Sequence, residues 1–177
     1  MNHFSINEKY EIMLQILKKP AHGRALAQEL DIPLTTVQNR LNQLMNEGVL
    51  EYKTEGKNKI FSLKQNSLAK AKIIMAEQYR LLKLYHTYPE LRIIFEQLTT
   101  QFKGMILLFG SYAKFSAKKD SDIDVYIRTK DKTIKEKLQH VNSKLSIQIG
   151  QLSKTDPLSR EIFNNHVIIH GVEEYYD

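Results

Sequence analysis

The chain has 177 residues, of which 42% are hydrophobic and 26% are charged, as in a soluble globular protein with one domain or two small ones. It contains no cysteine, which excludes a disulfide scaffold and any cysteine-ligated zinc or iron–sulfur site. No apolar run approaches the roughly 20 residues that span a bilayer, and the first residues lack the basic-then-apolar order of a signal peptide. We therefore expect a cytoplasmic protein with no membrane partner.

The formal net charge is +6, from 26 basic and 20 acidic side chains. Residues 1–65 hold 9 basic and 7 acidic side chains, residues 66–104 hold 6 and 3, and residues 105–177 hold 11 and 10. Because no segment is strongly basic, nucleic-acid binding has to be argued from a motif and cannot be argued from charge alone.

The first module, residues 1–65, is predicted to contain three helices and a hairpin. The first helix has apolar residues three and four apart, and Ser5 with Glu8 fits a capping box before it. Thr35 or Thr36 can cap the third helix, which is expected to end at Glu47–Gly48. In chain order, the apolar runs are Tyr10–Leu17, Ala25–Leu30, Val37–Leu44, Val49–Lys53 and Lys59–Leu63, with a turn over residues 54–58.

The stretch ALAQELDIPLTTVQNRLNQLMNEGVLEYKTEGKNKIFSL, within residues 5–65, resembles a winged helix-turn-helix domain. The resemblance implies that the third helix lies in the major groove of double-stranded DNA and that the wing contacts phosphates. Use of the same fold for protein contacts alone is the alternative. The candidate DNA-binding residues are Thr35, Thr36, Gln38, Asn39 and Arg40 on the helix, and Lys57 and Lys59 on the wing.

Residues 66–104 are predicted to form a helical connector, with one long helix over Ser67–Tyr85 and a second over Leu91–Leu98. The apolar stripe of the second helix is expected to pack in a core. The stripe of the first helix suits either a core or a contact with a second copy of the chain. Specific operator binding by such domains normally needs a dimer, so we expect a homodimer.

The second module, residues 105–177, alternates between strands and helices. Asp156 and Pro157 have the residue types preferred at an N-cap and at the first helical position. The expected strands are Met105–Phe109, Ser121–Ile127 and Ser146–Gly150, the expected helices are Thr133–Leu145 and one from Pro157 to about His166, and Val167–Tyr176 forms either a strand or a tail against the core.

The stretch LLFGSYAKFSAKKDSDIDVYI carries the chemistry of this module. Gly110 and Ser111 end a buried strand, and strand alternation places Asp122 and Asp124 together on one face of the next strand. Two neighbouring carboxylates form an oxygen-rich site for Mg²⁺. Gly110 allows close approach of the backbone, and the Ser111 hydroxyl with nearby amides can hold a triphosphate.

This arrangement resembles the minimal nucleotidyltransferase domain of the DNA polymerase β superfamily, over about residues 105–177, including the closing stretch PLSREIFNNHVIIHG. The resemblance implies that Asp122 and Asp124 are the catalytic, Mg²⁺-binding residues. It also implies that Gly110 and Ser111 bind the phosphates of a nucleoside triphosphate (NTP).

The sequence departs from this family at the third carboxylate, which the family has on the following strand. Here that strand has no Asp or Glu, and alternation places Gln148 at the possible third position, on the face of Asp122 and Asp124. Alternatively, Glu161, Glu173 or Glu174 supplies the missing acid. His166 and His170 lie four residues apart, but without a third ligand they are expected to be structural.

The predicted fold class is α+β, with an N-terminal winged helix-turn-helix, a helical connector and a C-terminal nucleotidyltransferase-like domain with a small mixed sheet. The leading functional prediction is Mg²⁺-dependent transfer of a nucleoside monophosphate from an NTP to an unknown acceptor, in a protein that also binds DNA. The alternative is a DNA-binding transcriptional regulator whose second domain binds a nucleotide or a protein partner without catalysis, including antitoxin-type roles.

Overall fold

The structure is a computed structural model, and it describes residues 5–153 and 155–176. The chain divides into two compact units between Tyr79 and Arg80, inside one long helix. The division falls within residues 66–104, the predicted connector, whose buried residues contribute to the cores of both units. Within the described residues, none of the helices combines the length and apolarity that a membrane-spanning helix needs.

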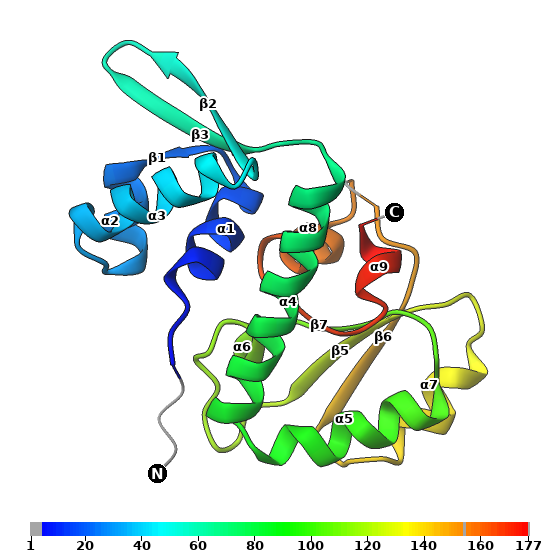
Figure 1. The fold of residues 1–177 in the computed structure, drawn as a ribbon. Helices are drawn as coiled ribbons and strands as arrows, with labels where there is room; N and C mark the ends of the chain where they lie inside the picture. Colours follow the sequence, from blue (N-terminus) through cyan, green and yellow to red (C-terminus); the bar gives the residue numbers. More distant parts are fainter. Residues whose placement is uncertain (1–4, 154, 177) are drawn as a thin grey trace. The chain divides into compact units, whose positions relative to one another are not determined.

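The N-terminal unit consists of three short helices and a small antiparallel sheet with strand order β1-β3-β2 (Figure 1). Leu26, Val37 and Leu41, which are at most 2% exposed, belong to its core, and Phe61 packs on the same cluster from the sheet. Its elements are α1 (Glu8–Lys18), β1 (Ala21–His22), α2 (Gly23–Leu30), α3 (Leu34–Asn46), β2 (Leu50–Glu55) and β3 (Asn58–Leu63), followed by the first part of α4 (Ser67–Thr87).

Two predicted helix caps in this unit are wrong. Helix α1 is capped by Asn7, whose side chain accepts a hydrogen bond from the Tyr10 amide, and Ser5 lies before the cap. Helix α3 begins at Leu34, so Thr35 and Thr36 lie inside its first turn, and the cap position is Pro33. Asn is as good an N-cap residue as Ser, and Pro33 leaves α3 without a side-chain cap, so residue type alone did not decide where either helix begins.

The C-terminal unit contains a four-stranded mixed sheet with strand order β6-β5-β4-β7. Strands β5 and β6 are parallel, and β4 pairs antiparallel with both β5 and β7. Its elements are α5 (Glu90–Gln101), β4 (Ile106–Leu108), α6 (Gly110–Ala113), β5 (Ile123–Arg128), α7 (Thr133–Gln139), β6 (Leu145–Gly150), α8 (Pro157–Asn164), β7 (Val167–His170) and α9 (Val172–Tyr175).

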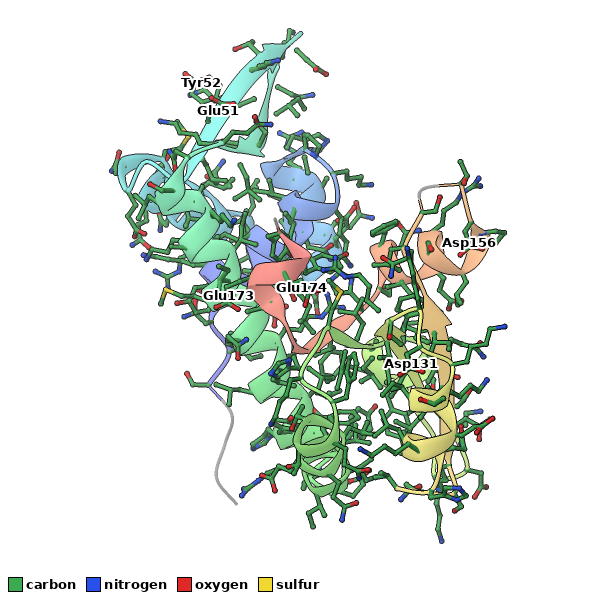
Figure 2. All side chains as sticks on the ribbon, turned by 90° about the vertical axis from the view of Figure 1, so that its right-hand side faces the viewer. Glu51, Tyr52, Asp131, Asp156, Glu173 and Glu174 are labelled. Atoms are coloured by element: carbon green, nitrogen blue, oxygen red, sulfur yellow. The ribbon has the colours of Figure 1, made fainter. Side chains whose placement is uncertain are left out.

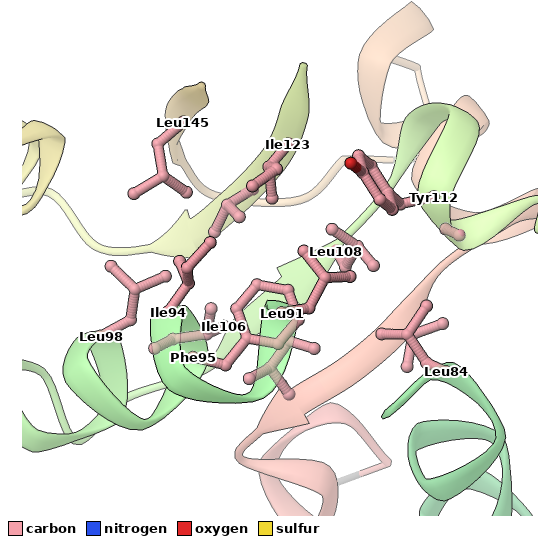
Figure 3. Packing of buried hydrophobic residues seen from close by; sticks show 14 of the residues in the cluster. Leu84, Leu91, Ile94, Phe95, Leu98, Ile106, Leu108, Tyr112, Ile123 and Leu145 are labelled. Carbon is pink, nitrogen blue, oxygen red and sulfur yellow. The ribbon is translucent and has the colours of Figure 1, made fainter. Parts of the chain in front are cut away.

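Helix α5 lies on one side of this sheet, and α8 and α9 lie on the other (Figure 1). The α5 side forms the main core, in which Phe95 packs with the inward side chains of the strands (Figure 3). Helix α7 is shorter than predicted, because the Asn142 side chain accepts a hydrogen bond from the Lys144 amide in a turn and Leu145 joins strand β6. Asp156 caps α8 as predicted, by accepting from the Ser159 amide.

Candidate functional site

The pairing of β4 with β5 brings the two halves of the Gly-Ser and Asp-x-Asp motif together. Leu108 is paired with Val125, and the Phe109 amide donates to the Asp124 carbonyl at 2.9 Å. The chain then enters the short helix α6 through Gly110, which has a φ of +69°. The ten residues between Ser111 and Asp122 form the rest of α6 and a loop, and this segment brings the chain back to the same end of the sheet at the start of β5.

Gly110 lies directly against the carboxyl group of Asp124. A Cβ added to Gly110 would overlap Asp124 Oδ2 and would lie 3.1 Å from Asp124 Cγ. Both the left-handed backbone and this close approach require glycine. Gly110, which was predicted to allow close approach of the backbone, is thus in contact with Asp124, one of the two predicted metal-binding residues.

Asp122 and Asp124 flank Ile123, which is 2% exposed and points into the core. The aspartates therefore lie on the opposite side from the core, with Asp122 exposed and Asp124 partly buried. Burial raises the pKa of Asp124, and the negative charges of Asp122 and Glu161 raise it further. A hydrogen bond from Ser146 and the positive charge of Lys114 act in the opposite direction.

The neighbouring strand places a hydroxyl beside Asp124. In the parallel pairing of β5 with β6, Asp124 is opposite Ser146 and Tyr126 is opposite Gln148. Gln148 lies on the predicted face, but it is two residues farther along the strand than Ser146, about 7 Å at the rise of a strand. Ser146 precedes Gln148 by two residues and therefore shares its face of the strand, but its pairing with Asp124 depends on the register between the two strands, which alternation does not reveal.

Three glutamates were the alternatives for the missing third acid. Glu161, on α8, forms an ion pair with Lys114 at 2.8 Å, and it is close enough to raise the pKa of Asp124. Glu174 pairs with Arg128, and both Glu173 and Glu174 lie on α9 (Figure 2). Of the three glutamates, Glu161 is the one whose charge raises the pKa of Asp124, so the structure favours it over Glu173 and Glu174.

The donor set around Asp124 suits Mg²⁺ held partly by a substrate. Among the described residues, no three His, Asp or Glu side chains come together as a metal-binding group. Mg²⁺ typically takes one or two protein carboxylates and completes its shell with phosphate oxygens and water. The pair Asp122 and Asp124 fits that pattern.

The two C-terminal histidines have structural contacts. His166 Nδ1 lies 2.7 Å from the Ile162 carbonyl oxygen, and its ring packs on Tyr175 with centroids 4.7 Å apart. His170 Nδ1 lies 3.0 Å from the Gly104 carbonyl oxygen. These contacts agree with the expectation that the pair is structural.

The N-terminal unit has a separate groove of about 1110 Å³ between α3 and the β2–β3 hairpin. None of the described residues that line it is acidic. Gln38, Asn39, Lys57 and Lys59, all predicted to bind DNA, line this groove, whereas Thr35, Thr36 and Arg40 do not. The groove also has polar lining residues that were not among the predicted DNA-binding residues: His22, Arg24, Asn42, Asn46, Tyr52 and Asn58.

Arg40 has a different environment from the one predicted. Its Nε donates to Glu8 on α1 at 2.8 Å, and its Nη1 donates to Gln43 at 3.1 Å. The ion pair offsets the charge that was expected to face phosphates. No local pattern revealed it, because Glu8 and Arg40 are 32 residues apart in the sequence.

Comparison with known families agrees with the C-terminal geometry. Residues 94–174 match the family model described as Polymerase beta, Nucleotidyltransferase. The match supports a nucleotidyltransferase-type domain in this part of the chain. It begins inside α5, so it includes part of the predicted connector. Comparisons with curated proteins and with solved structures gave no match.

Proposed function

We propose that the C-terminal unit transfers a nucleoside monophosphate from an NTP to an acceptor, with Mg²⁺ bound by Asp122 and Asp124. The observation that carries the proposal is the contact of the Gly110 backbone with the Asp124 carboxyl group. This contact supports the proposal, because the turn proposed to bind phosphate and the carboxylate proposed to bind the metal lie side by side. The family match over residues 94–174 supports the same chemistry.

Each motif residue has a defined task in this proposal. Asp122 and Asp124 hold the metal, which offsets charge on the phosphates during transfer. Gly110 leaves room for the Asp124 carboxyl group beside the turn, and the Ser111 hydroxyl donates to a phosphate oxygen. Ser146 donates to Asp124 and so orients that carboxylate toward the metal.

Binding of an NTP with Mg²⁺ tests this site. A ligand that binds only the folded protein stabilises it by about 2.7 kcal/mol at 100 times its Kd, so the melting temperature of wild type should rise. The double variant Asp122→Asn with Asp124→Asn should lose this rise and keep its circular dichroism spectrum. The matched control is the double variant Lys130→Ala with Lys132→Ala, which changes two exposed lysines outside the motif. A rise that persists in the aspartate variant would refute the assignment.

Catalysis is tested with labelled NTP, Mg²⁺ and a cell lysate as the source of acceptor. Transfer of label by wild type supports the enzyme. Glu161→Gln then tests whether Glu161 is the third acid, because loss of transfer with retained NTP binding assigns that role to it. Binding without transfer supports the alternative, a regulator whose second domain binds nucleotide without catalysis.

We also propose that the N-terminal unit binds double-stranded DNA as a winged helix-turn-helix domain. The groove beside α3 supports this, because its polar lining combines amides with Arg24, Lys57 and Lys59. Amide side chains can read base edges, and the cations can contact phosphates. Lys59 also lies 4.3 Å from the ring centroid of Tyr52, which fixes the position of one cation on the wing.

Duplex binding at several salt concentrations, measured by fluorescence anisotropy, tests this proposal. Lys57→Ala with Lys59→Ala should weaken binding to all sequences and lower the salt slope by about 2, since each phosphate contact contributes about 0.9. Gln38→Ala or Asn39→Ala should alter sequence preference. Arg40→Ala should have a smaller effect than Arg24→Ala, because Arg40 is paired with Glu8. Absence of duplex binding at low salt would favour the protein-contact alternative.

A homodimer through α4 is part of the same proposal. Leu68 and Met75 are 46% and 49% exposed, and their seven-residue spacing places them on one side of the helix. Sedimentation velocity should show a dimer for wild type and a monomer for Met75→Lys. A wild-type monomer at high concentration would exclude this interface.

A further inference from the structure

A second pocket, of about 570 Å³, lies in the C-terminal unit on the α5 side of the sheet. Its volume is within the range of small-molecule sites. Tyr112 and Ile123 line it, and they are the chain neighbours of Ser111 and Asp122. Figure 3 shows both side chains at one edge of the core cluster. The pocket is therefore next to the motif but open to the opposite side of the strand.

The floor of this pocket is aromatic and aliphatic. Tyr88 and Tyr112 meet edge to face, with ring centroids 4.9 Å apart, and burial raises the pKa of Tyr112, so its hydroxyl stays protonated. Ile93 is 65% exposed at the start of α5, although it is a large apolar side chain. A flat ring bound here would cover this exposed apolar area and pack against an aromatic surface.

The rim of the pocket is mostly cationic. Its charged lining residues are three lysines and one glutamate: Lys118, Lys119, Lys144 and Glu90. Lys144 donates to the Lys119 carbonyl at 2.5 Å, which ties the two rim loops together and leaves the Lys118 and Lys119 side chains exposed. A rim with an excess of positive charge around a ring-lined floor is complementary to a ring that carries an anion.

We propose that this pocket binds a nucleoside monophosphate, with the base against Tyr88 and Ile93 and the phosphate at Lys118 and Lys119. The site goes beyond the proposed transfer reaction. Neither Asp122 nor Asp124 lines it, so it requires no metal ion. Its binding can therefore be measured separately from the binding of NTP with Mg²⁺.

Isothermal titration of the full-length protein with AMP, in EDTA and low salt, tests the proposal. Wild type should bind AMP saturably. Lys118→Ala with Lys119→Ala should weaken binding at least about tenfold, the loss that corresponds to about one charge-assisted contact. Asp122→Asn with Asp124→Asn should keep the affinity of wild type, as should the control Lys130→Ala with Lys132→Ala.

A second variant separates the base from the phosphate. Ile93→Asp changes an exposed side chain, so the fold should be retained, and it should weaken AMP binding by placing a charge against the base. Adenosine and inorganic phosphate should each bind more weakly than AMP. Any of three results would overturn the proposal. The first is loss of AMP binding in the variant with Asp122 and Asp124 replaced, the second is full affinity in the variant with Lys118 and Lys119 replaced, and the third is no saturable binding by wild type.

Discussion

Gly110→Ala tests the contact on which the proposed active site depends. Gly110 has a φ of +69°, and the added Cβ would overlap Asp124 Oδ2 and lie 3.1 Å from Asp124 Cγ. Left-handed backbone costs an L-residue about 1–2 kcal/mol, and overpacking at a tight contact typically costs about 1–3 kcal/mol. Replacing glycine by alanine also lowers the conformational entropy of the unfolded chain, which offsets about 0.4–1 kcal/mol of this loss. We therefore expect the C-terminal unit to lose about 1–5 kcal/mol of stability, with a middle value of about 3 kcal/mol.

Gly48→Ala is the matched control, because Gly48 has a φ of +74° and no atom within 4 Å of its added Cβ. It should show the backbone cost alone, about 1 kcal/mol after the gain from the unfolded chain. Urea unfolding followed by circular dichroism measures both variants. A thermal-shift assay with NTP and Mg²⁺ should show that Gly110→Ala also weakens binding, because the Asp124 carboxylate is displaced.

A double-mutant cycle with Asp124→Ala isolates the contact itself. The cost of Gly110→Ala should fall by about 1 kcal/mol or more in that background, since the carboxyl group is absent. Equal losses for Gly110→Ala and Gly48→Ala, together with an unchanged cost in the Asp124→Ala background, would refute the reasoning.

Two further predictions concern the same face of the sheet. Asp124→Asn should stabilise the metal-free protein at pH 7, because burial raises the pKa of Asp124 above 3.8 and its charge costs stability. The gain should shrink as the pH falls through the raised pKa and vanish below about 3.8, where the carboxyl group is protonated in the folded and in the unfolded protein. Urea titrations that show a pH-independent gain would contradict this. Ser146→Asp should tighten Mg²⁺ binding more than Gln148→Asp, because Ser146 is the residue paired with Asp124. Calorimetric titration with Mg²⁺ measures both, and the reverse order would contradict the register argument.

Several parts of the fold and site followed from local pattern. Most helices and strands, and the cap of α8 by Asp156, were predicted from periodicity and from residue types with specific backbone preferences. The small mixed sheet of the C-terminal unit was predicted from the family resemblance, and strand β1 and helix α9 were not predicted. The Gly-Ser and Asp-x-Asp spacing also indicated which residues would meet. These features are visible in sequence because each depends on neighbours within a few residues or on alternation along one strand.

The remaining features depend on contacts between residues far apart in the chain. The register between β5 and β6 puts Ser146, and not Gln148, beside Asp124. Alternation could not distinguish the two, because a register shift of two residues leaves the same side chains on each face of the strand. Arg40 pairs with Glu8, and Glu161 approaches Asp124 from α8, because helix packing brings together side chains that no short pattern connects. Sequence thus determined which chemical groups the protein has, and only the tertiary structure decided which of them share a site, because packing and strand register set those distances.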